Sequence, residues 1–224
     1  MSICWIVLTD GRKNYISESL PTWIKEYDSQ IKDKFIVDDS GDKEYADWLT
    51  EFFPTFNIVS IKNSRQGYAK AVQNVFRVFR ESGCEFALHL EDDFILHKPV
   101  NLQDIVSVLE QNPNVAQMSI MRQPWYHNEV EHGGVVEALE INKAKFTNKN
   151  TLGFDWVEHR SFYTCNPNVI PRWTTDTPWP DGNWSESRFG REIFAKKKTV
   201  GIWGNRKDWP HTEHIGRERN GTDY

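Results

Sequence analysis

The chain has 224 residues, of which 38% are hydrophobic and 26% are charged, and its formal net charge is -5. This length supports one sizeable domain and is short for two complete ones, so we expect a single domain over residues 1–224. The negative balance opposes broad attraction to nucleic acid, although it leaves room for a local basic surface.

The three cysteines, Cys4, Cys84 and Cys165, are far apart and lack metal-type spacing. This usage favours reduced thiols and a cytoplasmic protein. We expect no membrane span, because no segment reaches the necessary length, and the first residues lack the features of a signal peptide. Ten tryptophans predict an aromatic-lined cleft, since sugars and nucleobases stack on such rings.

Strands and helices are predicted to alternate in the first part of the chain. Apolar runs predict strands at 3–8, 34–37, 57–61 and 84–90. Apolar residues at helical spacing predict helices at 15–27 and at 46–53, and a third helix that follows Gly67 and continues through residue 79. This alternation predicts an α/β fold with a mostly parallel sheet flanked by helices. Open sheets of this kind bind ligands at the carboxyl ends of their strands.

The second part of the chain is less regular. Periodicity is poor over 122–151, where Gly133 and Gly134 indicate irregular structure and a hairpin containing 135–141. Ser185 is a suitable N-cap for a helix. The remaining predicted elements are a helix at 102–109, strands at 115–121, within 162–172 and at 199–203, and an open segment at the tail.

Three consecutive carboxylates, Glu91, Asp92 and Asp93, interrupt an apolar run over 87–96. The run predicts a buried strand that surfaces, presents its acids and continues into a second hydrophobic piece. Adjacent acids repel one another and need a cation, and Mg²⁺ or Mn²⁺ binds carboxylate oxygen while leaving positions for water and phosphate. The stretch predicts a metal-diphosphate site, with a solvated acidic turn as the alternative.

A second candidate site follows the third predicted strand. Gly67 frees the turn before a helix, whose amino terminus carries partial positive charge, and Arg65 and Lys70 flank it. This stretch is suited to holding an anion. A plain loop and an amphipathic helix with solvated cations form the alternative.

Taken in order, these motifs resemble glycosyltransferases of the GT-A fold, closest to the family-2-like inverting enzymes and similar to bacteriophage-encoded members. The resemblance covers nearly the whole chain. It implies a Rossmann-like central sheet, a nucleotide-binding half over 1–96, and an acceptor-binding half with the C-terminal tail over 97–224. It also implies transfer of a sugar from a nucleotide diphosphate, with a UDP-sugar as the expected donor, to a hydroxyl with the help of Mn²⁺ or Mg²⁺.

The resemblance assigns roles to the acids of the first half. The family's acid after an early strand, which contacts the base or ribose, corresponds to Asp38 and Asp39; an Asx turn is the alternative for either. In the acid motif, Asp93 corresponds to the metal ligand, and Asp92 to a ligand of sugar or ribose hydroxyls. From the residue patterns and the resemblance together, the expected substrate-binding residues are Thr9, Asp10, Arg12, Asp38, Asp39, Arg65, Gly67, Lys70, Asn74, Glu91, Asp92, Trp184 and Arg188.

The resemblance also assigns the catalytic base. In the family this base is an acid at the start of a late helix, which corresponds to Glu186, with Asp181 as a competitor. As a general base, Glu186 would take the acceptor's proton during inversion. A salt bridge to Arg188 or Arg191 is the structural alternative. His214 corresponds to the late histidine that completes the metal or phosphate shell, and a partly exposed tail histidine is its alternative.

Other functions stay open. A sugar-phosphate nucleotidyltransferase shares much of this architecture, and a non-catalytic carbohydrate-binding protein would use the aromatic rings. The acceptor is open between hydroxymethylated DNA, protein and glycan. Cations concentrate over 188–219, including Arg219, and such a surface either guides a DNA backbone or is simply solvated.

Overall fold

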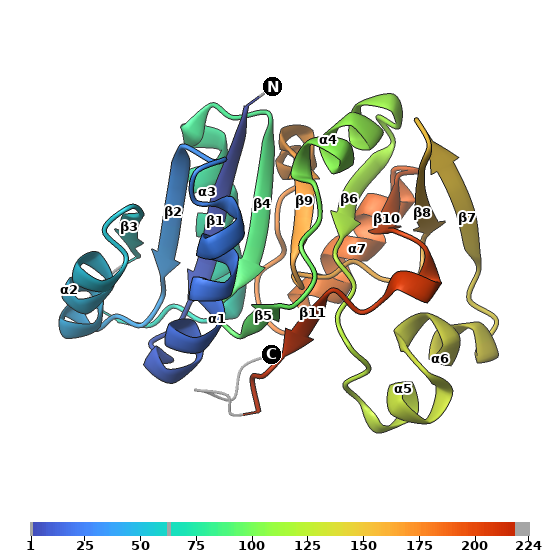
Figure 1. Ribbon diagram of the computed structural model, residues 1–224. Coiled ribbons are helices and arrows are strands. Elements are labelled where there is room, and N and C mark those ends of the chain that lie inside the picture. The colour runs from blue at the N-terminus through green and yellow to red at the C-terminus, as the bar shows by residue number, and fades with distance from the viewer. Residues whose placement is uncertain (1, 62–63, 218–224) are drawn as a thin grey trace.

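The computed structural model describes residues 2–61 and 64–217, so Arg219 lies outside the described part of the chain. Its core is a nine-stranded sheet in the order β3-β2-β1-β4-β9-β6-β10-β8-β7 (Figure 1). The strands in this order are β3 (Asn57–Ser60), β2 (Asp33–Asp38), β1 (Ile3–Thr9), β4 (Phe86–Glu91), β9 (Asn168–Pro171), β6 (Val115–Ser119), β10 (Thr199–Trp203), β8 (Phe154–His159) and β7 (Phe146–Thr151).

The strands that form the nucleotide-binding half in the resemblance pair in parallel. β3, β2, β1 and β4 are parallel neighbours, and β6 pairs in parallel with β10. β9 is antiparallel to both β4 and β6, so β4 and β6 run in the same direction; β8 and β7 add antiparallel pairs at the far edge. The predicted α/β class with a mainly parallel central sheet is confirmed.

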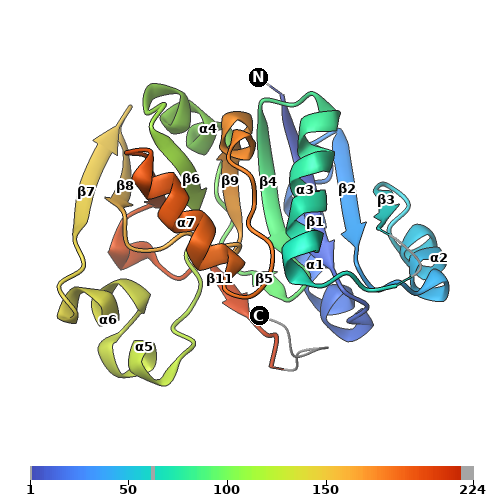
Figure 2. The ribbon, with the colours of Figure 1, turned by 180° about the vertical axis from the view of Figure 1, so that it is seen from behind.

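Helices cover both faces of the sheet. α1 and α4 lie on the face seen in Figure 1, and α3 and α7 lie on the opposite face, which Figure 2 shows from behind. The helices are α1 (Lys13–Tyr27), α2 (Lys43–Phe52), α3 (Tyr68–Ser82), α4 (Leu102–Gln111), α5 (His127–His132), α6 (Val135–Ile141) and α7 (Ser185–Ala195), with short 3₁₀ helices η1 (Arg172–Asp176) and η2 (Arg206–Asp208). No helix within the described ranges is long and apolar enough to cross a membrane.

Alternation along β1 explains the two-sided core. Trp5 and Val7 pack into the cluster under α1 and α4, whereas Cys4, Ile6 and Leu8 pack into the cluster under α3 and α7. Successive side chains of a strand point to opposite faces, so an unbroken apolar run is what a strand covered on both faces requires. The buried strand predicted at 3–8 is confirmed.

The prediction of a hairpin in the irregular part is wrong for residues 135–141. Residues 135–141 form the helix α6, not a hairpin: the valines favour a strand, but Glu137, Ala138 and Leu139 are strong helix formers. The hairpin is instead β7–β8, joined by Leu152 and Gly153, which both have positive φ, as a type I′ turn requires. Its strand β7 is mostly exposed and polar, so it carries no apolar pattern to detect.

The tail is not open, as the sequence suggested, because β11 (Thr212–His214) pairs antiparallel with β5 (Phe94–Leu96). In this small sheet His214 is opposite Phe94, one residue after the acid motif. Trp23 of α1 donates a 2.7 Å hydrogen bond from Nε1 to the Phe94 carbonyl, which fixes β5 against the domain. The pairing brings the end of the described chain to the carboxyl end of β4.

Candidate active site

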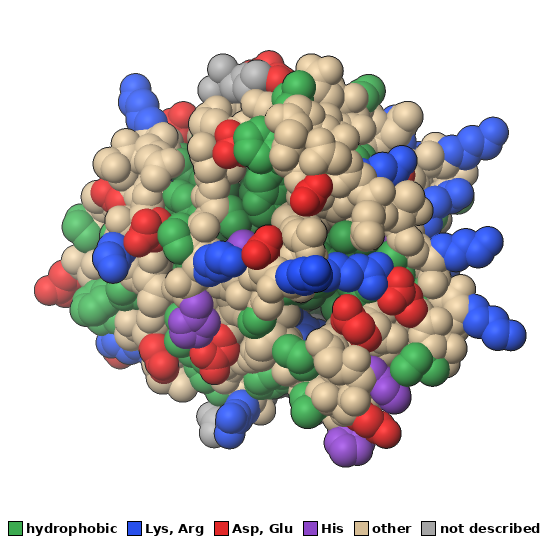
Figure 3. Space-filling view, turned by 45° about the vertical axis from the view of Figure 1, so that its right-hand side comes forward, with side chains coloured by type: hydrophobic (Ala, Val, Ile, Leu, Met, Phe, Trp, Pro, Cys, Tyr) green, Lys and Arg blue, Asp and Glu red, His purple; other side chains and the backbone are tan. Residues whose placement is uncertain are grey.

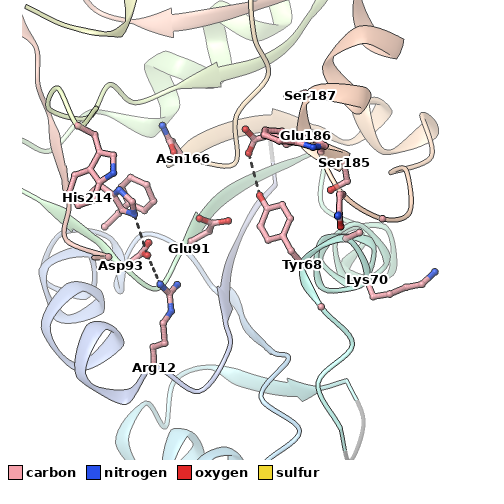
Figure 4. Close-up of a pocket in the computed structure, with 18 of the residues that line it drawn as sticks. Arg12, Tyr68, Lys70, Glu91, Asp93, Asn166, Ser185, Glu186, Ser187 and His214 are labelled. Atoms are coloured by element: carbon pink, nitrogen blue, oxygen red, sulfur yellow. Dashed lines mark hydrogen bonds and ion pairs between the residues drawn. The ribbon is translucent and has the colours of Figure 1, made fainter. Parts of the chain in front are cut away.

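A cavity of about 670 Å³ opens where β4 ends. Segments that are distant in the sequence form its walls, including the β4–β5 turn, the start of α3, the start of α7 and the chain around β11 (Figure 4). The predicted site residues that line it are Arg12, Gly67, Lys70, Glu91, Asp93, Asp181, Trp184, Glu186 and His214. The structure therefore brings together candidates from both halves of the chain.

The three acids point in different directions. Asp92 is fully buried and is held by Thr9, whose hydroxyl donates to Oδ2 at 2.6 Å, whereas Glu91 and Asp93 line the cavity. Burial raises the pKa of Asp92 to about 7, and the Arg12 charge and the Thr9 bond oppose that rise. Asp92 is thus a buried anchor of the turn and does not face the cavity.

Arg12 lies among these carboxylates. Its guanidinium contacts Asp93 at 2.8 Å (Nη1 to Oδ2), Asp92 at 2.5 Å (Nη2 to Oδ1) and Asp10 at 2.8 Å (Nε to Oδ1). Burial alone lowers the pKa of Arg12, but the surrounding charges outweigh burial and raise it. The chain therefore supplies a permanent cation of its own to the acid motif.

Asp93 faces His214 across the edge of the cavity (Figure 4). The distance from His214 Nε2 to Asp93 Oδ2 is 3.3 Å, and the imidazole lies between the rings of Phe94 and Trp125, with centroids 4.7 and 4.3 Å away. Burial raises the pKa of Asp93, but the hydrogen bond from His214 and the charge of Arg12 outweigh it and lower the pKa. Asp93 is therefore ionised at neutral pH.

These residues fit a divalent ion that is only partly held by protein. Among the described residues, no three His, Cys, Asp or Glu side chains gather closely enough to hold a metal. Asp93 and His214 would supply two ligands to such an ion, and Asp93 Oδ1 is buried without a hydrogen-bond partner among the described residues. Mg²⁺ and Mn²⁺ bound to one or two carboxylates usually complete their shell with water and phosphate oxygens.

Glu186 lies in the first turn of α7, across the cavity from Asp93 (Figure 4). Its Oε2 accepts hydrogen bonds from the Cys165 backbone N–H at 3.0 Å and from the Tyr68 hydroxyl at 3.3 Å. Burial raises the pKa of Glu186, and these hydrogen bonds oppose the rise. A carboxyl held this way, facing a cavity, has the position and the raised basicity that a general base needs.

The salt bridge that was the alternative role for Glu186 does not form among the described residues. Within the part of the chain that is described, no salt bridge joins Glu186 to either arginine, since Arg188 donates to the Asp181 carbonyl and Arg191 to the Ser187 carbonyl. The predicted N-cap is displaced by one residue: Ser185 is the first residue of α7. Trp184 occupies the cap with a left-handed φ of 58°.

No protein-family model and no curated protein sequence matches the chain. The chain does match solved structures. The S. aureus TarS 1–349 fragment in complex with UDP-GlcNAc superposes with a TM-score of 0.66 at 16% identity, over 98% of this chain and 60% of that one. The Pyrobaculum calidifontis mannosyltransferase PcManGT, in complex with GDP-Man and Mn²⁺, gives 0.58 at 15% identity, over 92% and 57%.

The chain has the GT-A glycosyltransferase fold. Identities of 16% and 15% establish the architecture and leave the chemistry to the residues of the site. The chain spans about 60% of the length of the TarS fragment.

In this GT-A fold the acids after β1 and β2 form a layer beside the cavity without lining it. Asp39 accepts hydrogen bonds from the backbone N–H groups of Gln66 and Gly67, at 3.0 and 2.9 Å, and so fixes the loop before α3. Asp38 accepts from the Ser40 N–H at 2.8 Å, which is the Asx-type turn foreseen as an alternative. Burial raises the pKa of both carboxyls.

The other predicted residues have local partners. Asp10 pairs with Arg65 as well as Arg12, and Thr9 contacts the Tyr45 hydroxyl at 2.6 Å. Asn74 bonds within α3, to the Lys70 carbonyl and to Arg77. The predicted residues that do not line the cavity are Thr9, Asp10, Asp38, Asp39, Arg65, Asn74, Asp92 and Arg188.

Asp181, the competing base, lies at the rim. It is paired with Lys70 at 2.6 Å and accepts a 2.8 Å hydrogen bond from Gln73. The Lys70 hydrogen bond lowers the pKa of this exposed carboxyl. Asp181 is thus a weaker base than Glu186, and its carboxylate is already paired with Lys70.

Several cavity residues were not predicted from the sequence, among them Tyr68, Arg122, Trp125 and Asn166. Tyr68 had a usable signal, because it directly follows the glycine that opens α3. The other three lie in the β6–α5 connection and the loop before β9, where no periodicity exists. Only the fold brings them to the carboxyl end of β4.

Proposed function

We propose that this protein is a glycosyltransferase that moves a sugar from a nucleoside-diphosphate donor, a UDP-sugar, to a hydroxyl acceptor with inversion. One observation carries the proposal: a half-buried carboxyl with a raised pKa, Glu186, faces the Asp93–His214 pair across a cavity of about 670 Å³. A general base on one side and a site suited to a metal ion with its diphosphate on the other is the arrangement that displacement at an anomeric carbon needs.

The diphosphate is proposed to lie on the Asp93 side of the cavity. Arg12 lies on this side, next to Asp93, and supplies positive charge there, whereas Lys70 lines the same cavity from the start of α3, where it pairs with Asp181. Asp93 and His214 would hold Mn²⁺ or Mg²⁺. When bound, such an ion withdraws charge from the departing phosphate. The aspartates after β1 and β2 are still proposed to help bind the nucleoside. They would do so indirectly, by fixing the loops beside the cavity.

Glu186 is proposed to accept the acceptor's proton. The Cys165 N–H and the Tyr68 hydroxyl hold its Oε2, which leaves Oε1 for the incoming hydroxyl. The hydroxyl oxygen then attacks the anomeric carbon as the bond to the diphosphate oxygen breaks. Because base and leaving group lie on opposite sides, the reaction inverts the anomeric centre.

The test separates donor binding from transfer. Asp93→Ala is expected to abolish turnover and metal-dependent nucleotide binding. Glu186→Gln is expected to keep UDP binding and to reduce transfer by about 10²-fold or more, the scale of general-base catalysis. UDP binding is measured by calorimetry with Mn²⁺, and transfer by UDP release from a panel of UDP-sugars with mixed acceptors.

Other outcomes would point elsewhere. Full activity in Glu186→Gln would remove Glu186 as the base. Pyrophosphate release from a nucleoside triphosphate and a sugar phosphate would indicate a nucleotidyltransferase, and carbohydrate binding without nucleotide binding would indicate a binding protein. The kinship with bacteriophage enzymes and a location in the (host) cytoplasm stay predictions from the sequence.

A further inference from the structure

A second cavity of about 560 Å³ adjoins the first. It lies between one face of α7, the segment 160–166 and the chain after β6. Neither Asp93 nor His214 lines it. The residues common to both cavities are Arg122, Tyr126, Asn166, Glu186 and Ser187.

Glu186 therefore stands at the junction of two spaces. A general base must reach the proton that it removes, so the acceptor hydroxyl has to come within hydrogen-bond distance of this carboxyl. With the diphosphate on the Asp93 side, the second cavity is the space that touches Glu186 without touching the donor's anchor. Its volume lies within the range of small-molecule sites, which is enough for one sugar or polyol unit.

The charges that line the second cavity are unbalanced. Of its two carboxylates, Glu129 is neutralised by Arg122 in a bidentate pair at 2.7 and 3.0 Å, and the other is Glu186 itself. Arg160 and Arg191 also line the cavity, and both are exposed. In the described ranges neither forms an ion pair; each donates to a backbone carbonyl, of Phe194 and Ser187 respectively.

We propose that the second cavity is the acceptor site and that Arg160 and Arg191 select an acceptor that carries phosphate. This inference rests on the proposed function. A guanidinium has five N–H donors in a planar fork that matches phosphate oxygens. Each arginine uses one N–H on a carbonyl in the hydrogen bonds above, so donors remain for an anion. Two such cations, lining the same cavity as the base, hold a phosphate while a hydroxyl elsewhere on the acceptor reaches Glu186.

The test uses glycerol 1-phosphate as the probe and glycerol as its uncharged counterpart, titrated into the UDP-saturated protein and followed by NMR. The expected result is binding of glycerol 1-phosphate and no detectable binding of glycerol. The double variant Arg160→Gln/Arg191→Gln is expected to weaken binding about tenfold or more. Arg172→Gln, an exposed arginine on η1 outside both cavities, makes a matched control and should bind like the wild type.

The outcomes are distinguishable. Equal binding of glycerol 1-phosphate by the double variant and the wild type would overturn the inference, as would equal binding of glycerol and its phosphate. Failure to bind UDP would instead count against the proposed function, because the titration can be repeated without nucleotide. A single-stranded oligonucleotide that displaces the probe would identify the phosphate as that of a nucleic acid backbone; no displacement would identify it as that of a small ester.

Discussion

At the scale of single residues, the decisive feature is that Arg12 already balances the acids of the β4–β5 turn. Asp92 is fully buried and Asp93 nearly so, and Arg12 bridges both. A buried carboxylate is stable only when it is paired. The sequence revealed the acids and their need for a cation; it did not reveal that an arginine 80 positions away meets part of that need.

Arg12→Gln is expected to lower the free energy of unfolding by about 3 kcal/mol, because removing one partner of a buried pair leaves an uncompensated charge. Mn²⁺ should restore more stability to this variant than to the wild type, since the vacated charge favours a second cation near Asp93. Urea unfolding with and without Mn²⁺ measures both effects.

The matched control is Arg77→Gln, which breaks an exposed pair with Glu81 on α3. It should change stability by less than about 1 kcal/mol, the range of surface pairs, and should not alter the response to Mn²⁺. If Arg12→Gln behaved like this control, the aspartates would not need Arg12 as their counter-ion.

At the scale of elements, the β5–β11 pairing builds the site from two ends of the chain. It places His214 beside Asp93, and Gly216 then passes so close that an added Cβ would overlap Asp93 Oδ2 and lie 3.0 Å from His214 Nε2. Strands of three residues carry little pattern, so this pairing was not predictable from the sequence. The longer elements β1, β2, α3 and β4 were predictable, because their apolar residues follow the pattern of a buried strand or of an amphipathic helix.

Gly216→Ala is expected to displace the tail from Asp93 and weaken Mn²⁺-dependent UDP binding about tenfold or more, by analogy with the loss of a supporting contact at a metal site. The far core does not touch Gly216, so the thermal unfolding midpoint should change little. Calorimetry with UDP and Mn²⁺ measures the first effect.

Arg217→Ala is the control for the tail. Arg217 follows Gly216, is exposed, and donates a hydrogen bond to the Tyr15 hydroxyl from its backbone N–H, which the substitution keeps. It should bind UDP like the wild type. Equal binding by Gly216→Ala would mean that the tail does not shape the site.

At the scale of the whole molecule, the central strands of the sheet are covered on both faces, and two histidines on the sheet, His89 and His159, are buried. Burial lowers the pKa of His89 to about 4 and that of His159 to about 3. His89 lies on β4, and His159 lies between the rings of Phe146 and Phe162. Both are therefore neutral in the folded state at pH 6.

The two buried histidines should make the fold less stable in acid. Between the unfolded histidine pKa of about 6.5 and the folded values near 4 and 3, the unfolded chain binds more protons, so stability falls as the pH falls. Replacing His89 and His159 with glutamine should flatten this dependence. Urea midpoints at pH 7.5, 6 and 5 measure it, and an equal slope in the double variant would contradict the assignment.

The sequence allowed the α/β class and the parallel strands of the first half to be predicted because buried parallel strands carry unbroken apolar runs. It also located both ends of the cavity, the acids after β4 and Glu186 at the start of α7. It did not allow the walls between them to be predicted, since Arg122, Trp125 and Asn166 lie in aperiodic connections. Those connections are positioned by long-range pairing alone.

The central claim is that this cavity binds a nucleoside diphosphate between Asp93 and Glu186. A crystal structure of the protein with UDP and Mn²⁺ tests it most directly. We expect Mn²⁺ bound by Asp93 and His214, the diphosphate on that ion, and Glu186 facing the β-phosphate across open space. A nucleotide bound elsewhere, or a metal that avoids Asp93, would contradict it.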